Sequence, residues 1–168
     1  RSGEAQAADE FSRTEGGFSR FNFDVNHVSK LSKVTQFYIF AHGQLANRNL
    51  DSSEQFYLGG ADAVRAYPQG EAGGDSGYQA TAELRYQTPV KGMSMTLFAD
   101  VGEVLARKDG DTSDPHRRLA GWGIGAVYSL DRSLYARLDY ARKIKGESYR
   151  SEAEDKNGRL WFRLYKLF

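Results

Sequence analysis

The chain has 168 residues and a formal net charge of +1, from 23 Lys and Arg against 22 Asp and Glu. This balance excludes a nucleic-acid binder whose affinity depends on neutralising many phosphates. The absence of Cys excludes disulfides, thiolate metal sites and a cysteine nucleophile. The length fits one domain, and no apolar run is long enough for a transmembrane helix. Many Gly, Tyr and Phe, with only 3 Pro, favour β-structure over a helical bundle.

Seven segments alternate apolar and polar residues with a period of two, which is typical of strands rather than helices. In chain order they are 20–26, 34–45, 78–87, 93–101, 119–128, 134–141 and 159–168. The segment from Tyr78 is the clearest, because Leu84 falls on one face and Glu83 and Arg85 fall on the other. The sequence therefore predicts an all-β, antiparallel fold of seven strands.

The spacers between these segments alternate strictly between long and short. The long ones are 1–17, 47–77, 103–117 and 144–157, and the short ones are 29–33, 88–92 and 130–133. This rhythm is typical of an outer-membrane β-barrel, which has tight periplasmic turns and long outer loops. Strands of this length also match a tilted crossing of the bilayer. We therefore expect 1–17 to be the remnant of an outer loop and 18–168 to be the C-terminal part of a transmembrane β-barrel.

The two faces of such strands predict different surroundings. In a membrane barrel the apolar faces contact lipid and the polar faces line the pore. The expected pore-lining residues are Glu83, Arg85, Arg137 and Asp139. Seven strands would leave two open edges, so an isolated segment of this kind is expected to need detergent, to refold into a non-native form or to pair its edges with another copy. Bacterial barrels of one chain have even strand numbers, which predicts at least one further strand before residue 18.

A glycine-rich segment leads into the strand at Tyr78 and carries the most specific pattern of the chain. It contains Gly59 and Gly60, then the run Val64, Arg65, Ala66, Tyr67 and Pro68. The following strand carries the run Phe98, Ala99, Asp100, Val101 and Gly102. In the order and spacing of both motifs, and in its terminal Phe168, the chain resembles the two-partner-secretion transporters (TpsB proteins) of the haemolysin secretion/activation family. Tyr67 favours this branch over the related barrel-assembly branch.

The resemblance covers residues 18–168 and implies a sixteen-stranded barrel in the Gram-negative outer membrane, preceded by periplasmic polypeptide-transport-associated (POTRA) domains. It implies secretion of a large exoprotein of haemolysin or adhesin type through the pore, with no cofactor. The partners implied are that exoprotein, outer-membrane lipid and the barrel-assembly machinery that inserts the barrel. The resemblance also implies that 47–77 folds into the pore and that Arg65 pairs with Asp100. The functional loop residues are then Gly59, Gly60, Val64, Arg65 and Tyr67, and the loop–barrel contact residues are Asp100, Phe98 and Gly102.

The residues themselves support a loop inside the pore. Asp100 shares the polar face of its strand with Thr96, so it points into the lumen. A loop of about 30 residues without periodicity is uncommon unless it is functional. The glycines at 121, 123 and 125 lack side chains on one face, which lets another backbone approach closely. Ala66 replaces the Gly of the family and would be strained only at a positive φ.

Other functions fit the pattern less well. An outer-membrane enzyme would need a catalytic set at the barrel rim, and none is visible, so we expect no enzyme. A soluble, lipocalin-like ligand-binding barrel fits the length and would reverse the two faces. The histidines at 27, 42 and 116 lack the spacing of metal ligands. A calcium loop at Asp109 to Asp114 would lack its central Gly and terminal Glu, so we expect no metal.

Overall fold

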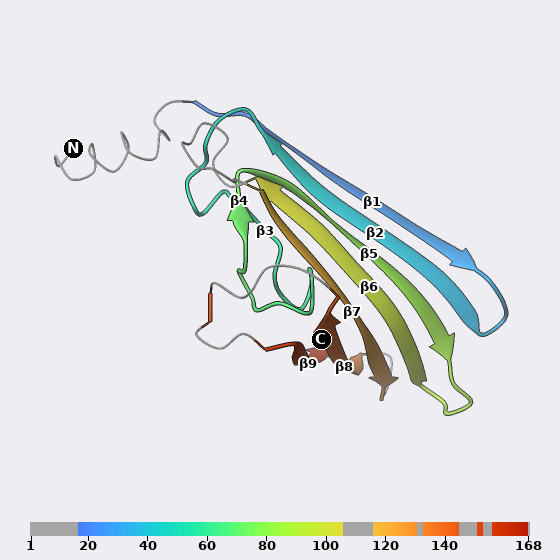
Figure 1. Cartoon of the computed structure of the whole chain (residues 1–168). Helices are drawn as coiled ribbons and strands as arrows, with labels where there is room; N and C mark the ends of the chain where they lie inside the picture. Colours follow the sequence, from blue (N-terminus) through green and yellow to red (C-terminus); the bar gives the residue numbers. More distant parts are fainter. Residues whose placement is uncertain (1–16, 106–115, 131–132, 145–150, 153–155, 168) are drawn as a thin grey trace.

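The computed structural model describes residues 17–105, 116–130, 133–144, 151–152 and 156–167. Seven long strands form one antiparallel sheet in the order β1-β2-β5-β6-β7-β8-β9 (Figure 1). Their bounds are Arg20–Lys30 (β1), Thr35–Ala46 (β2), Ser76–Gln87 (β5), Met93–Leu105 (β6), His116–Ser129 (β7), Leu134–Lys143 (β8) and Gly158–Lys166 (β9). The predicted all-β, antiparallel fold is confirmed. None of the residues described forms a helix long and apolar enough to cross a membrane.

Two further strands lie inside the long segment between β2 and β5. These are β3 (Phe56–Tyr57) and β4 (Gly73–Gly74), which pair antiparallel in a separate two-stranded sheet. Strands of two residues are too short to show a period, so the sequence did not predict them. Figure 1 shows them on the concave side of the curved seven-stranded sheet.

The alternation of side chains sorts the sheet into an outward and an inward face. Large apolar side chains that are exposed on the outward face include Ile39, Leu45, Leu84, Met95, Leu97, Val101, Ile124, Leu138 and Phe162. The inward face buries polar side chains such as Glu83, Asp100 and Asp139. The register places Thr81, Asp100 and Gly121 side by side on β5, β6 and β7. The faces are therefore those of a sheet with an apolar exterior and a polar interior.

The buried apolar cluster lies between the long segment and the inward face. Its members are Phe56, Leu58, Val64, Ala66, Tyr67, Ala72, Phe98, Val104, Leu119 and Ala141. Six of the ten come from the segment between β2 and β5, and the rest come from β6, β7 and β8. Complete burial of a large apolar side chain stabilises by roughly 1.5–3 kcal/mol. Burial in this cluster therefore holds the long segment against the sheet.

The sheet is open at both edges. Within the described ranges, β1 pairs with β2 alone and β9 pairs with β8 alone. The expectations made for residues 1–16, for the acidic run from Asp109 to Asp114 and for Phe168 fall outside the part of the chain that the structure describes.

Candidate functional site: a loop latched to the inner face

The long segment folds as a two-stranded stalk that carries a compact tip. We define the stalk as residues 56–59 and 71–74, because the pairing of β3 with β4 continues through Leu58 N–H to the Ala72 carbonyl (3.2 Å) and Gly59 N–H to the Glu71 carbonyl (3.0 Å). The tip is residues 60–70, and the Val64 N–H closes it onto the Leu58 carbonyl at 2.8 Å. The tip is thus a preformed unit that presents its side chains to the sheet.

Glycines 59 and 60 are required where the stalk meets the tip. Gly60 has φ 137°, a value that favours glycine. A Cβ at Gly59 would collide with the Pro68 carbonyl and lie 2.6 Å from the Cβ of Glu71. Both positions therefore need a residue without a side chain, for conformation at Gly60 and for space at Gly59.

Arg65 joins the tip to two strands of the inward face. Its Nε and Nη2 donate to the two carboxylate oxygens of Asp100 at 2.9 and 2.7 Å, and its backbone N–H donates to the same carboxylate at 3.1 Å. Its Nη1 donates to Glu83 Oε1 at 2.9 Å. We call these three residues the latch. Arg65 is 3% exposed and Asp100 is 1% exposed, so the latch is closed to solvent.

The latch keeps Arg65 charged. Burial lowers the pKa of the Arg65 guanidinium, but the hydrogen bonds and charges of Asp100 and Glu83 outweigh burial and raise that pKa above its ordinary value. The planar guanidinium suits this place because it can bind a carboxylate with two parallel hydrogen bonds. The latch therefore does not open by loss of a proton from Arg65.

Aromatic and hydroxyl groups complete the surroundings of Arg65. Its guanidinium carbon lies 3.4 Å from the centre of the Phe98 ring, a cation–π contact. Trp161 of β9 donates its indole N–H to the Arg65 carbonyl at 2.7 Å. Thr81 donates to Asp100 Oδ1 at 3.0 Å. Trp161 was not among the predicted site residues, although its place on the polar face of the last strand marked it as pointing inward.

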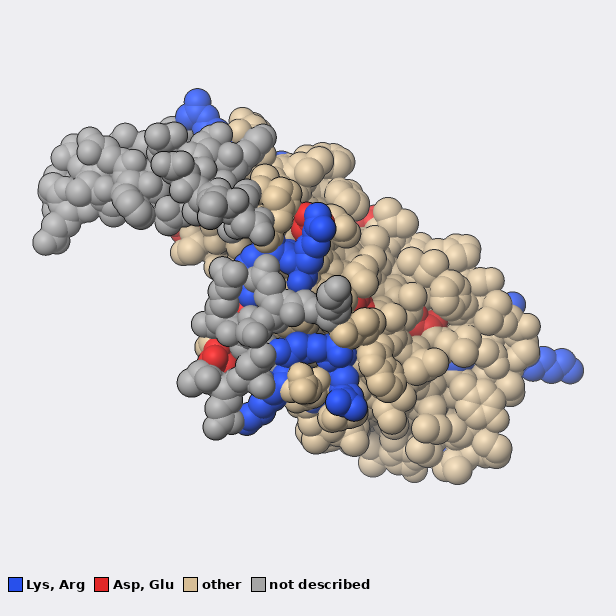
Figure 2. Space-filling view, in the orientation of Figure 1, with Lys and Arg blue, Asp and Glu red and all other residues tan. Residues whose placement is uncertain are grey.

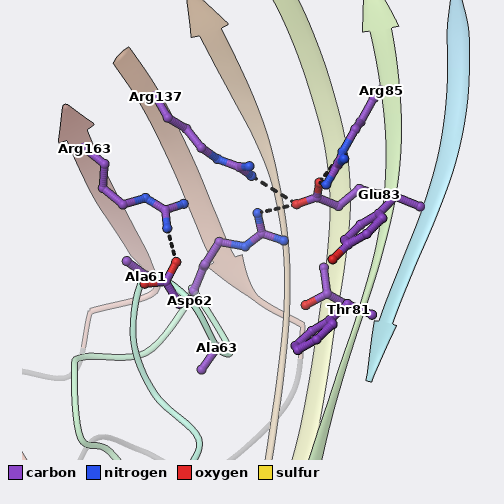
Figure 3. Close-up of a pocket in the computed structure, with 11 residues that line it drawn as sticks. Ala61, Asp62, Ala63, Thr81, Glu83, Arg85, Arg137 and Arg163 are labelled. Carbon is purple, nitrogen blue, oxygen red and sulfur yellow. Dashed lines mark hydrogen bonds and ion pairs between the residues drawn. The ribbon is translucent and has the colours of Figure 1, made fainter. Parts of the chain in front are cut away.

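The expected pore-lining residues extend the charged cluster beyond the latch. Figure 3 shows Arg85 and Arg137 converging on Glu83, with ion-pair distances of 2.7 and 3.0 Å. Arg137 also binds Asp139 at 2.7 Å, and Arg163 links Asp139 at 3.0 Å to Asp62 of the tip. The cluster comprises Arg65, Arg85, Arg137 and Arg163 with Asp62, Glu83, Asp100 and Asp139. Its four positive and four negative charges therefore balance while the tip is docked.

A cavity of about 320 Å³ lies beside the cluster. Its lining comprises Tyr38, Phe40, Ala61, Asp62, Ala63, Arg65, Thr81, Glu83, Arg85, Arg137 and Arg163. The tip forms one wall, while β2, β5, β8 and β9 form the rest. In the view of Figure 2 many of the visible Lys and Arg atoms lie near the centre left, a few lie at the far right, and most of the described surface is tan. The docked tip thus borders a polar space on the inward face of the sheet.

The three glycines of β7 leave space for different neighbouring groups. A Cβ at Gly121 would lie 2.6 Å from the Cβ of Ala66, so there the tip does approach the strand closely. At Gly123 and Gly125 the space is taken by side chains of the neighbouring strands, Phe98 and Asp139. The loop contact expected along the whole glycine run therefore holds at Gly121 only.

The remaining predicted positions also lie at the contact between loop and sheet. Val64 and Tyr67 are fully buried. A Cβ at Gly102 would lie 2.5 Å from the Leu58 side chain. Among the described residues other than glycine, only Ala72 has a positive φ, so Ala66 carries no strain from replacing the glycine of the family.

Comparison of the sequence with known proteins shows which family the chain belongs to. Residues 2–128 match the family described as haemolysin secretion/activation protein ShlB/FhaC/HecB. The chain belongs to this family. The resemblance drawn from the two sequence motifs is confirmed, and with it the class of two-partner-secretion transporters located in the outer membrane of Gram-negative bacteria.

Individual relatives agree with the family. The heme/hemopexin transporter protein HuxB of Haemophilus influenzae is 34% identical over 88 residues, which are 51% of this chain and 16% of HuxB. The structure of CdiB from Acinetobacter baumannii has a TM-score of 0.65 and 20% identity, and the match covers 89% of this chain and 27% of CdiB. The similarity to the CdiB structure supports the fold of this chain. This chain spans about a sixth of the length of the curated relatives that it matches.

Proposed function

We propose that this chain forms part of an outer-membrane barrel that secretes a large exoprotein of haemolysin or adhesin type, with the tip as the movable occupant of the pore. The observation that carries this proposal is the latch, in which a buried arginine of the tip is bound by carboxylates of two neighbouring strands. A tip held in this way blocks the inward side of the sheet. Passage of a polypeptide would require the latch to open.

The barrel we propose is larger than the sheet described here. The described sheet ends at β1 and β9, and unpaired strand edges are not tolerated in the hydrocarbon region. We propose that residues 18–168 supply one part of a closed barrel and that further strands complete it. In this arrangement, periplasmic domains outside these residues capture the exoprotein, and the barrel-assembly machinery inserts the barrel among outer-membrane lipids.

The side chains of the inward face support transport rather than catalysis. Members of the charged cluster bind one another in ion pairs and hydrogen bonds, as Arg137 does with Glu83 and Asp139. Such a cluster of balanced charges suits a path along which a polypeptide slides without a chemical step. We therefore propose that the chain has no enzymatic role.

Photo-crosslinking at neighbouring residues of β2 would test the path directly. Phe40 faces the cavity, whereas Ile39 is exposed on the outward face, so each is replaced in turn by a photoreactive phenylalanine analogue. The complete transporter is expressed with its exoprotein partner, and export is stalled before irradiation. We expect adducts with the exoprotein from position 40 and none from position 39. Secretion without any adduct at position 40 would contradict the proposal.

A further inference from the structure

Glu71 makes a second, separate attachment of the loop, at the junction of stalk and tip. Its side chain is buried, and its Oε1 accepts a hydrogen bond from Arg117 Nη2 at 2.7 Å. Its Oε2 accepts hydrogen bonds from the backbone N–H and the hydroxyl of Ser151 at 3.0 and 2.5 Å. One carboxylate therefore connects the stalk to the start of β7 and to the segment between β8 and β9.

The backbone around Glu71 is shaped to aim this carboxylate. Gly70 has φ 76° and Ala72 has φ 55°, so both neighbours lie in the left-handed region. A positive φ is uncommon for alanine and persists only where the surrounding structure imposes it. The N–H of Glu71 donates to the Pro68 carbonyl at 3.2 Å, and its own carbonyl accepts from Gly59. The turn is thus fixed from both sides while the side chain reaches Arg117 and Ser151.

The Glu71 attachment and the latch hold different parts of the loop. The latch binds Arg65 at the tip, whereas Glu71, Arg117 and Ser151 bind the stalk, and the two sets share no residue. Burial of Phe56 and Leu58 fixes the stalk further. Release of Arg65 would therefore leave the stalk attached to the wall of the sheet.

We propose that Glu71 is a positioning residue that acts as the pivot of the loop. When the latch opens, the tip swings about Glu71 while the stalk stays attached to Arg117 of β7 and to Ser151. This inference deepens the proposed function, since it concerns how the tip clears the pore. It also ties the stalk to Ser151, in one of the long segments expected to lie outside the cell.

Ion conductance of the complete transporter in planar lipid bilayers tests the pivot without any exoprotein. Three variants are compared with the unaltered protein: Arg65→Ala, Glu71→Gln and the double variant. Glu71→Gln alone should change conductance little, because the latch still holds the tip. Arg65→Ala should raise conductance partly, because the docked stalk still obstructs the pore. The double variant should exceed Arg65→Ala by more than about threefold, as expected of two coupled attachments.

Matched variants separate a pivot from a purely structural role. Arg117→Gln removes the β7 partner of Glu71, so it should give the same conductance as Glu71→Gln. It replaces Glu71→Gln in the test if that variant fails to fold. Glu103→Gln breaks an ion-pair cluster with Arg118 and His116 on the outward face of β6 and β7, and it should leave conductance unchanged in both backgrounds.

Two results would overturn the pivot. One is a double variant that conducts no more than Arg65→Ala. The other is Glu71→Gln or Arg117→Gln alone opening the channel as far as Arg65→Ala does. Because conductance is measured without the exoprotein, a transporter that gates as expected but secretes nothing would count against the proposed function and not against the pivot.

Discussion

The inward and outward faces of the seven-stranded sheet consist of alternate residues of the same strands, yet they are covered in opposite ways. The inward face buries charged side chains such as Asp100 and Asp139 beneath the loop. The outward face exposes Leu97, Ile124 and Leu138, as a lipid-facing surface should. Ion pairs therefore stabilise the inward face, whereas transfer of apolar side chains into lipid stabilises the outward face.

The loop gives the inward face its only second layer within the described residues. In a soluble sandwich, two sheets bury their apolar faces against each other. Here the buried apolar cluster forms between the loop and the sheet. The strand ladder does not depend on this cluster, since its hydrogen bonds run from strand to strand. Changes at the latch should therefore displace the loop, whereas changes on the outward face should prevent insertion.

The largest effect on the inward face is expected from Arg65→Ala. Removing one partner of a buried ion pair typically costs ~3–5 kcal/mol, and lumen water should reduce this. The barrel should insert normally but secrete poorly, and Asp100→Ala should behave in the same way. The double variant should be little worse than either single variant, because each already breaks the same contact. The measurement is secreted exoprotein per inserted transporter, with the heat-modifiable gel shift reporting folding.

A neighbouring arginine provides the control for this prediction. Arg118 is exposed and pairs with Glu103 outside the loop, so Arg118→Ala should secrete normally. Additive losses from the two single latch variants, or full secretion by Arg65→Ala, would exclude the functional pairing.

On the outward face, Leu97→Arg should act on insertion instead. A charged side chain facing lipid near the midplane costs about 2–4 kcal/mol in a membrane barrel. We expect less inserted protein and a lower midpoint for loss of the heat-modifiable form. Ser94→Arg on the inward face of the same strand should be tolerated. Unchanged insertion and heat resistance of Leu97→Arg would show that Leu97 does not face lipid.

Gly121→Ala tests the close approach of the two backbones on the inward face. The added methyl would meet the Cβ of Ala66 at 2.6 Å, and such overpacking costs about 1–3 kcal/mol. Insertion should be normal, but protease should cut the displaced loop faster. Adding Ala66→Gly removes the nearest contact and should restore protection. If the second substitution rescues nothing, the tip does not rest on Gly121 in the membrane.

The two faces also explain what the sequence could predict. Each strand shows its period of two locally, so the outward Leu97 and the inward Asp100 were assigned from their neighbours alone. The pairing of Arg65 with Asp100 needed a family motif, because no local pattern links residues 35 apart. Glu71 and Arg117 are 46 residues apart, and Trp161 and Arg65 are 96 apart. No motif indicated that either pair would be in contact. The contacts that Glu71 and Trp161 make were therefore found only in three dimensions.

The smallest effect is expected from Trp161→Phe, which removes one hydrogen bond to the Arg65 carbonyl and keeps an aromatic ring. A hydrogen bond of this kind contributes about 0.5–1.5 kcal/mol, so secretion should fall modestly and insertion should not change. Phe162→Leu, at the neighbouring outward position, should leave secretion unaltered. In an Arg65→Ala background the tip has already moved away from β9, so Trp161→Phe should add nothing to the loss. The measurement is again secreted exoprotein per inserted transporter, in both backgrounds. An equal loss in the two backgrounds would show that Trp161 acts elsewhere on the inward face and not through the position of Arg65.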